Sequence, residues 1–205
     1  MITKQSSPGV RLALDERLAR CAQLIIRARI FFDIWRSLRD ATMQPSLLDC
    51  MNDFPQFFRF APEAHFAAFV VHIVSMFDRT KETISLHHLR EEVKASCPTT
   101  LQSTAEIDEL FARVASLVKK TVILRNNLFA HRSATADYSA YFKRADVTPN
   151  QLVELTEIAL EIANRLLEAR GLSPQYFDTL ASRHTIAMLE ALGRPNWPDV
   201  DSEMA

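Results

Sequence analysis

Two side chains beyond the middle of the chain have the chemistry to act on a phosphate ester. Arg125 and His131 stand six positions apart. An imidazole can accept or donate a proton at neutral pH, and a guanidinium is always charged and matches the oxygens of a phosphate group. Asn126 and Asn127 add polar groups between them, and Arg132 adds a second cation. The segment therefore combines an acid/base group, an anion clamp and amides that can orient a ligand.

We expect one long helix to carry these residues. A first apolar stripe recurs at spacings of three and four, the pattern of a helix side that packs on a neighbour, and His131 takes the next position in that series. A second stripe runs through Phe111 and Val118 to Arg125. Both stripes end on a chargeable residue on the packed side, and a buried arginine needs a partner or an occupied cleft. The first stripe comprises Ile107, Leu110, Val114, Leu117, Thr121, Leu124 and Leu128.

The same helix lies in a positive stretch of a balanced chain. The formal net charge is −1, yet no Asp or Glu occurs between residues 110 and 136. Such a stretch attracts a phosphate-bearing ligand, and we expect Lys119, Lys120, Asn127 and Arg132 to bind it. Arg113 and Arg125 complete the cations of the stretch. The alternative is a solvated basic face opposite an acidic helix. That helix would be residues 151–170, with Glu154, Glu157, Glu161 and Glu168.

The string LRNNLFAHRS resembles the signature of the HEPN superfamily, a group of helical domains that often act as ribonucleases. That signature is an arginine, then a polar residue that is commonly asparagine, and later a histidine that usually follows a small residue. Arg125, Asn126, Ala130 and His131 occupy these positions. Some members carry His-x-Tyr, but Ser133 stands at the tyrosine position here, so no function of that tyrosine is carried over.

A second segment adds to the resemblance. FDRTKETISLHHL, residues 77–89, is similar to an abortive-infection, toxin-like branch of the superfamily, and the resemblance covers about residues 10–170. It implies a metal-independent endoribonuclease, a toxin or antiphage effector that acts on RNA and needs no cofactor. A cognate antitoxin protein is a further expected partner.

The residue types suggest how such an enzyme would work. RNA carries its own nucleophile, the 2′-OH beside the scissile phosphate, so His131 would act as general base or acid and Arg125 as the clamp. Asn126 would orient the phosphate or the histidine. Six residues rise about 9 Å along a helix, so one helix forms a poor site. Two copies across a two-fold axis would pair the side chains in one cleft, and the resemblance likewise implies a homodimer. The products would be a 2′,3′-cyclic phosphate and a 5′-OH.

Two other interpretations stay open. One is a catalytically silent helical dimer that binds RNA, a nucleotide or a protein partner through the same cleft. The other is a structural bundle in which Arg125 and His131 pair with carboxylates. A histidine at a helix end and an arginine on a helix flank both have ordinary structural roles.

Other candidate sites are weaker. His87 with Glu91, and His88 with Glu92, lie four residues apart and could hold a metal, but a di-iron bundle needs Glu-x-x-His twice and the chain has none. We therefore expect no metal site. The cysteines are odd in number, widely spaced and form no Cys-x-x-Cys, which favours reduced thiols in the cytoplasm. They are Cys21, Cys50 and Cys97.

The composition favours a single all-α domain over residues 1–205. Only three glycines occur, which argues against an all-β fold and against a Gly-rich phosphate loop. We expect a bundle of five or six helices with long antiparallel pairs, a core at about 10–170, and a C-terminal helix and acidic tail at 171–205. The expected helices span about 10–41, 62–78, 86–96, 103–131 and 148–171, with a last helical region from residue 173. Ser85 is the expected cap of the third helix, Thr148 and Gln151 fit a capping box at the start of the fifth, and Gly171 suits the position after its end.

A dense aromatic run precedes the second of these helices. We expect FPQFFRF, residues 54–60, in a loop with a short helix, with its four phenylalanines in the core and Pro62 at the first position of the next helix. The longest apolar stretch, residues 66–77, is too short to span a bilayer, and residues 1–10 show no apolar leader. These features predict a cytoplasmic protein without a membrane segment. The phenylalanines are Phe54, Phe57, Phe58 and Phe60.

Overall fold

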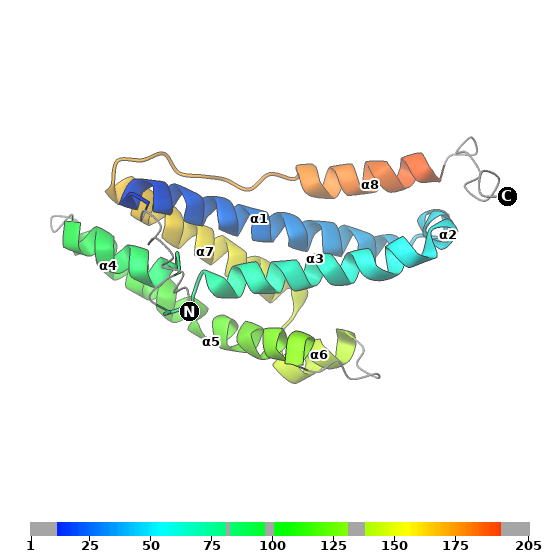
Figure 1. Cartoon of the computed structure of the whole chain (residues 1–205), viewed down its shortest axis with the longest axis horizontal. Helices are drawn as coiled ribbons and strands as arrows, with labels where there is room; N and C mark the ends of the chain where they lie inside the picture. Colours follow the sequence, from blue (N-terminus) through cyan, green and yellow to red (C-terminus); the bar gives the residue numbers. More distant parts are fainter. Residues whose placement is uncertain (1–11, 81–82, 97–100, 131–137, 194–205) are drawn as a thin grey trace, which may run out of the picture.

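The computed structural model describes residues 12–80, 83–96, 101–130 and 138–193, and its elements there are all α-helices (Figure 1). The all-α prediction is confirmed, with eight helices in the described part where five or six were expected. They are α1 (Leu14–Ala41), α2 (Pro45–Asp53), α3 (Pro55–Ser75), α4 (Leu86–Ser96), α5 (Leu101–Ala130), α6 (Tyr138–Ala145), α7 (Pro149–Ala169) and α8 (Leu180–Leu192).

Long antiparallel pairs form the body of the molecule. α1 packs on α3 and α7, α5 packs on α7 and α3, and α8 covers another side of α1 (Figure 1). The buried side of α1 recurs every three or four residues, as a helix with one face against the core requires. α5 and α8 thus lie on opposite sides of the α1–α3 pair (Figure 1).

An aromatic cluster joins α1, α3 and α6. The rings of Trp35 and Phe66 have centroids 4.6 Å apart, and those of Phe32 and Phe69 are 4.9 Å apart. Phe142 of α6 lies against Phe66 with a centroid distance of 5.3 Å. Aromatic pairs at these distances add stability beyond the area that they bury. The cluster therefore holds α6, which also packs on α5, against the body of the bundle.

A second, smaller core joins α1, α2, α3 and α8. Leu189 of α8 is fully buried in it, and the Cys50 thiol donates to the Leu189 carbonyl over 3.6 Å. The sequence predicts a last helical region from Ser173, but α8 begins at Leu180 after an extended stretch. The Asn164 amide explains this, because it binds both the backbone nitrogen and the backbone oxygen of Gln175, each over 2.8 Å. The other members of this core include Leu38, Ala41, Leu47, Met51, Phe58 and Ala61.

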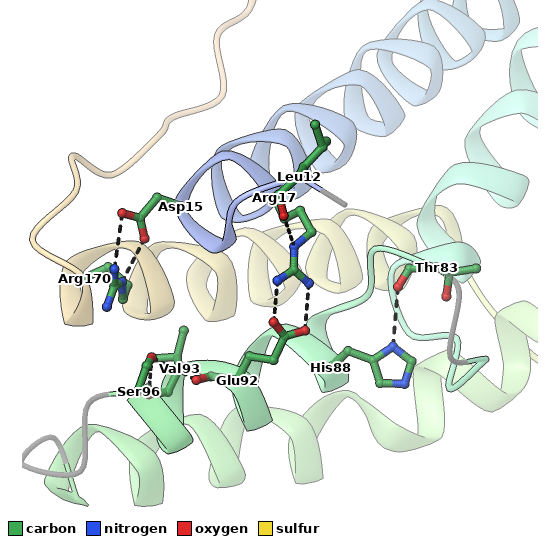
Figure 2. A network of polar contacts seen from close by, with 9 residues as sticks. All are labelled: Leu12, Asp15, Arg17, Thr83, His88, Glu92, Val93, Ser96 and Arg170. Atoms are coloured by element: carbon green, nitrogen blue, oxygen red, sulfur yellow. Dashed lines mark hydrogen bonds and ion pairs between the residues drawn. The ribbon is translucent and has the colours of Figure 1, made fainter. Parts of the chain in front are cut away.

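Ion pairs fix α4 and the end of α7 to the first helix. Figure 2 shows Arg17 of α1 donating to both carboxylate oxygens of Glu92 on α4, and also to the Leu12 carbonyl. It also shows Arg170, just after α7, bonded to Asp15 with the shorter contact at 2.8 Å. The two-pronged geometry of an arginine on a carboxylate fixes orientation as well as distance. α4 therefore has a defined place against α1.

The predicted seam of α5 is confirmed where its side chains are described. Its positions from Ile107 to Leu124 are all buried, and Phe111, Val118 and Arg125 lie half-buried on the flank. The Thr121 hydroxyl, the one polar member, donates to the Leu117 carbonyl over 2.7 Å. The side chain of Leu128 lies outside the described residues. The helix begins at Leu101, so the expected start at residue 103 came slightly late.

The prediction for the aromatic run is wrong. The segment is helical from Pro55 onward, and Pro62 lies inside α3 instead of starting it. A helix turns successive side chains to different faces, so only Phe58 is buried, while Phe57 and Phe60 are 58% and 59% exposed. Phe54 is half-buried. A proline within a helix removes a single backbone hydrogen bond, which the packing of α3 on α1 outweighs here.

Several other expected boundaries agree with the structure. Ser85 caps α4 by accepting from the His88 backbone over 3.4 Å. Thr148 and Gln151 form the predicted capping box of α7. Gly171 follows α7 with φ of +70°, the left-handed conformation expected after a helix. α6 was not predicted, because its eight residues make only about two turns, which is too short for a helical spacing to be recognised in the sequence.

One described helix, α3, is long and apolar enough by length and composition to cross a membrane. It packs along α1, and Phe66, Phe69 and Ile73 are fully buried in the core. These contacts account for its apolar composition as that of a core helix.

Candidate functional site

Arg125 lies near the C-terminal end of α5, on the half-buried flank of the helix. Its Nε and Nη2 donate to the Asn126 Oδ1 over 3.3 and 3.2 Å. The amide oxygen of the exposed neighbour thus accepts from one edge of the guanidinium. Arg125 and Asn126 are adjacent in the chain, and the roles predicted for them in the motif stay predictions.

The side chains of the remaining motif residues are not among those that the structure describes. His131 and Arg132 lie outside the described residues, and so does the side chain of Asn127. The juxtaposition of Arg125 with His131 accordingly stays a prediction.

The connection after α3 lies close to the end of α5. Hydrogen bonds from Thr80 to the Asp78 carboxylate, at 2.8 and 3.0 Å, lower the pKa of Asp78, and the positive charge of Arg125 lowers it further as a smaller cause. The backbone nitrogen of Leu86 donates to the Met76 carbonyl over 2.8 Å. This bond brings the end of α3 to the start of α4, and Phe77 and Arg79 of the connection lie beside α5.

Between this connection and α5 lies a pocket of about 350 Å³. Phe77 and Arg79 come from the connection, and His87 comes from α4. The α5 side is lined by Phe111, Ala112, Val114, Ala115, Val118 and Lys119. We name it the α5 pocket. Phe111 and Val118 belong to the stripe that continues to Arg125, so the pocket and the arginine share one face of the helix.

Flat rings form the wall of the α5 pocket. His87 and Phe111 stack nearly parallel, with centroids 4.4 Å apart and an angle of 17° between the rings. Phe77 meets Phe111 edge-on at 6.4 Å. Burial is the main cause that lowers the pKa of His87, and the positive charges of Arg79 and Arg90 lower it further. The imidazole therefore experiences a net positive surrounding.

The two lysines predicted to bind RNA have different surroundings. Lys119 is exposed and lines the α5 pocket. Lys120 faces α6 and forms an ion pair with Asp146 at 2.7 Å. Lys119 thus lines the α5 pocket together with Arg79, whereas Lys120 already has an anionic partner.

The alternative of an acidic helix opposite the cations of α5 finds no support among the described contacts. Within the described residues, no glutamate of α7 forms an ion pair with a cation of α5. Glu157 approaches Arg29 of α1 at 3.9 Å, and Glu161 approaches Arg165 of its own helix at 3.9 Å. Among the described residues, these glutamates therefore do not pair directly with the cations of α5.

The weak metal candidates on α4 have other partners. His87 stacks on Phe111, Glu91 binds Arg90, and Glu92 binds Arg17. His88 lies 3.4 Å from the Thr83 carbonyl (Figure 2). Across the part of the chain that the structure describes, no three His, Cys, Asp or Glu side chains gather to hold a metal ion.

The two cysteines in the described part are free thiols and buried. Burial raises the pKa of Cys21 to about 12, which suppresses its thiolate at neutral pH. Burial also raises the pKa of Cys50. Cys97 lies outside the described residues.

Sequence reasoning missed the α5 pocket as a unit. Phe77, Arg79 and His87 lie more than twenty residues from Phe111 along the chain. The periodicity of α5 placed Phe111 on a flank but gave no partner for it. The resemblance of residues 77–89 to a family branch does not indicate which part of the structure they contact.

Comparison with protein families gives a match for residues 11–184, to a family described as AbiU2 with an HEPN domain. The match spans α1 to α7 and the first part of α8. No curated protein and no solved structure matches the chain.

Proposed function

The chain belongs to the AbiU2 family of the HEPN superfamily, and from this premise we propose that it is a metal-independent endoribonuclease that acts as an abortive-infection effector in the cytoplasm. The family assignment supports an effector of the HEPN type. The cleavage of RNA and the residues that perform it are the proposal.

One observation carries the proposal most directly. Arg125, the first residue of the family-like motif, lies half-buried at the end of α5 with its guanidinium held by Asn126. In the sequence, Arg125 lies within the positive stretch, residues 110–136, that contains no Asp or Glu. A fixed guanidinium in a positive field is suited to stabilise a phosphate as negative charge develops on its oxygens.

His131 would supply the proton transfers. One imidazole takes the proton from the 2′-OH, whose oxygen then bonds to the adjacent phosphorus. The bond between phosphorus and the 5′-oxygen breaks, and a second imidazole in its protonated form gives that oxygen a proton. The products are a 2′,3′-cyclic phosphate and a 5′-OH, and the protons balance without a metal ion.

The requirement for two imidazoles leads to a homodimer. Arg125 and His131 are six residues apart, which is about 9 Å along a continuous helix axis. Two copies of the motif across a two-fold axis would supply two histidines and two arginines to one cleft. Sedimentation equilibrium of the purified chain tests this, with a mass of one protomer as the contradicting result.

The main test is cleavage without divalent metal. Purified wild-type chain, Arg125→Ala and His131→Ala are incubated with total RNA in EDTA, and the fragments are assayed for a cyclic phosphate end. We expect cleavage by the wild type and a loss of at least about 100-fold in each variant, the effect of removing an acid/base or charge-stabilising group. Arg113→Gln, an exposed cation on the same helix, is the matched control and should retain activity.

The outcomes separate the alternatives. Cleavage that survives in both motif variants contradicts the proposed residues. No cleavage by the wild type, together with retained binding of RNA, supports the catalytically silent dimer instead.

A further inference from the structure

We propose that the α5 pocket is a nucleobase and phosphate subsite, which binds single-stranded RNA next to the nucleotide that is cleaved. This inference rests on the proposed function, because it assigns the ligand of that function to a second set of residues. The family match covers the pocket residues but assigns them no role.

The ring geometry fits a base. His87 and Phe111 both line the pocket and lie nearly parallel at 4.4 Å, so each ring covers one face of the other and a base would stack on a ring face that this contact leaves uncovered. Phe77, edge-on to Phe111, closes the wall beside it. Stacking of bases on aromatic side chains is the usual way in which proteins hold unpaired nucleotides, and it tolerates any base. The pocket volume of about 350 Å³ lies in the range of small-ligand sites.

The charge distribution fits the phosphate. Arg79 and Lys119 are exposed, line the pocket from opposite sides, and belong to different elements. The residues that line the pocket include no carboxylate. Burial is the main cause that lowers the pKa of His87, and the positive charges of Arg79 and Arg90 act in the same direction, as expected for cations close to the rings. An anion would relieve this repulsion.

The position of the α5 pocket would let one RNA strand reach both the pocket and Arg125. Val118 lines the pocket and Arg125 is seven residues further on the same stripe, which is about 10 Å along the helix. Asp78, beside both Phe77 and Arg79 in the chain, is near enough to Arg125 to feel its charge. A short oligonucleotide can therefore contact the pocket and the guanidinium at the same time.

A binding experiment with an uncleavable probe tests the inference. The probe is a fluorescein-labelled 2′-O-methyl oligouridine of about ten nucleotides, which lacks the free nucleophile. Its affinity for the full-length protein is measured by fluorescence anisotropy for wild type, Phe111→Leu, Arg79→Gln and Lys119→Gln. Leucine keeps most of the apolar bulk at position 111 and removes the flat face.

We expect Phe111→Leu to weaken probe binding by about fivefold or more, the effect of losing one stacked base. Lys119→Gln should reduce the slope of log affinity against log salt concentration by about 0.7, the effect of one phosphate contact on a single strand. Arg79→Gln should act similarly. Arg113→Gln, exposed on α5 but not part of the pocket, should bind as the wild type does.

Unchanged affinity and salt slope in all three pocket variants would overturn the subsite. An equal loss in the variants and in Arg113→Gln would also overturn it, because it would show a diffuse charge effect. Thermal unfolding of each variant, followed by circular dichroism, confirms that weaker binding comes from a folded protein.

Failure of the subsite and failure of the nuclease give different results. If wild type cleaves RNA, Arg125→Ala does not, and the pocket variants bind the probe normally, then the subsite is wrong and the nuclease stands. If wild type does not cleave RNA but the pocket variants bind the probe more weakly, then the subsite stands and the nuclease is wrong.

Discussion

Two of the concave regions formed by the described residues have opposite character and lie on opposite sides of the α1–α3 pair. The α5 pocket has stacked rings and two cations around a volume of about 350 Å³. The second region, which we name the α8 groove, is larger, at about 580 Å³, and lies between α1, α3 and α8. Ile30, Phe57 and Met188 are typical of its apolar lining, and no Lys or Arg occurs among the lining residues. Size alone would select the α8 groove, whereas charge selects the α5 pocket for a polyanion.

This difference suggests a division of roles. The α8 groove overlies the second core, which includes Leu38 and Leu189, so substitutions beneath it should act on stability. The rim of the α5 pocket is exposed and charged, so substitutions there should act on ligand binding. The following experiments test that division.

The largest effect is expected from Leu189→Ala. Leu189 is fully buried beneath the α8 groove, and truncating a buried leucine typically costs about 2–5 kcal/mol. Urea unfolding should show this loss in the free energy of unfolding. Affinity for the 2′-O-methyl oligouridine should stay within about twofold where the protein is folded, and a parallel loss of affinity would break the division.

Reversal of both charges at the α5 pocket comes next. Arg79→Glu with Lys119→Glu replaces two phosphate contacts by two repulsions, so RNA affinity should fall on the order of 100-fold at low salt. Both residues are exposed, so the urea midpoint should hardly move. Leu180→Glu, which places a carboxylate at the exposed edge of the α8 groove, is the control and should leave RNA affinity unchanged.

A pH effect should separate the two regions further. The folded-state pKa of His87 is lowered by burial and by nearby positive charges, so the unfolded chain binds more protons there. Stability from this residue is therefore lost as the pH falls below the usual histidine pKa of about 6.5. His87→Phe keeps a ring and removes the titration. Its free energy of unfolding relative to wild type should rise between pH 8 and pH 5, and a constant difference would contradict the assignment.

The smallest effect is expected from Met188→Ser in the α8 groove. Met188 is 41% exposed, whereas its neighbour Leu189 is fully buried. Such a surface change usually alters stability by no more than about 0.5 kcal/mol. Urea midpoints of the two neighbouring variants, measured together, show whether the second core or the groove surface supplies the stability.

The sequence predicted the parts of the molecule that depend on local periodicity. The seam from Ile107 to Leu124 is one example, and the capping box at Thr148 is another. In both, neighbouring residues along the chain decide the result. Arg125 on the flank of the seam followed from the same periodicity.

It failed where tertiary packing overrides local signals. Pro62 and the phenylalanines before it indicated a loop, but packing against α1 extends α3 through them. The α5 pocket was not predictable in this way, because Arg79, His87 and Phe111 meet only after α3, α4 and α5 have packed. The spacing of residues within a single helix cannot predict that these three side chains contact one pocket.

The ion pair between Arg17 and Glu92 shows how distant parts of the chain can govern the pocket. Glu92 lies five residues after His87 on α4, and Arg17 holds it from the first helix (Figure 2). Because both residues belong to one short helix, the ion pair at the middle of α4 helps to fix the position from which His87 stacks on Phe111. If the α5 pocket binds RNA as proposed, substitutions in the first helix would change its ligand preference from a distance and leave the reacting groups intact.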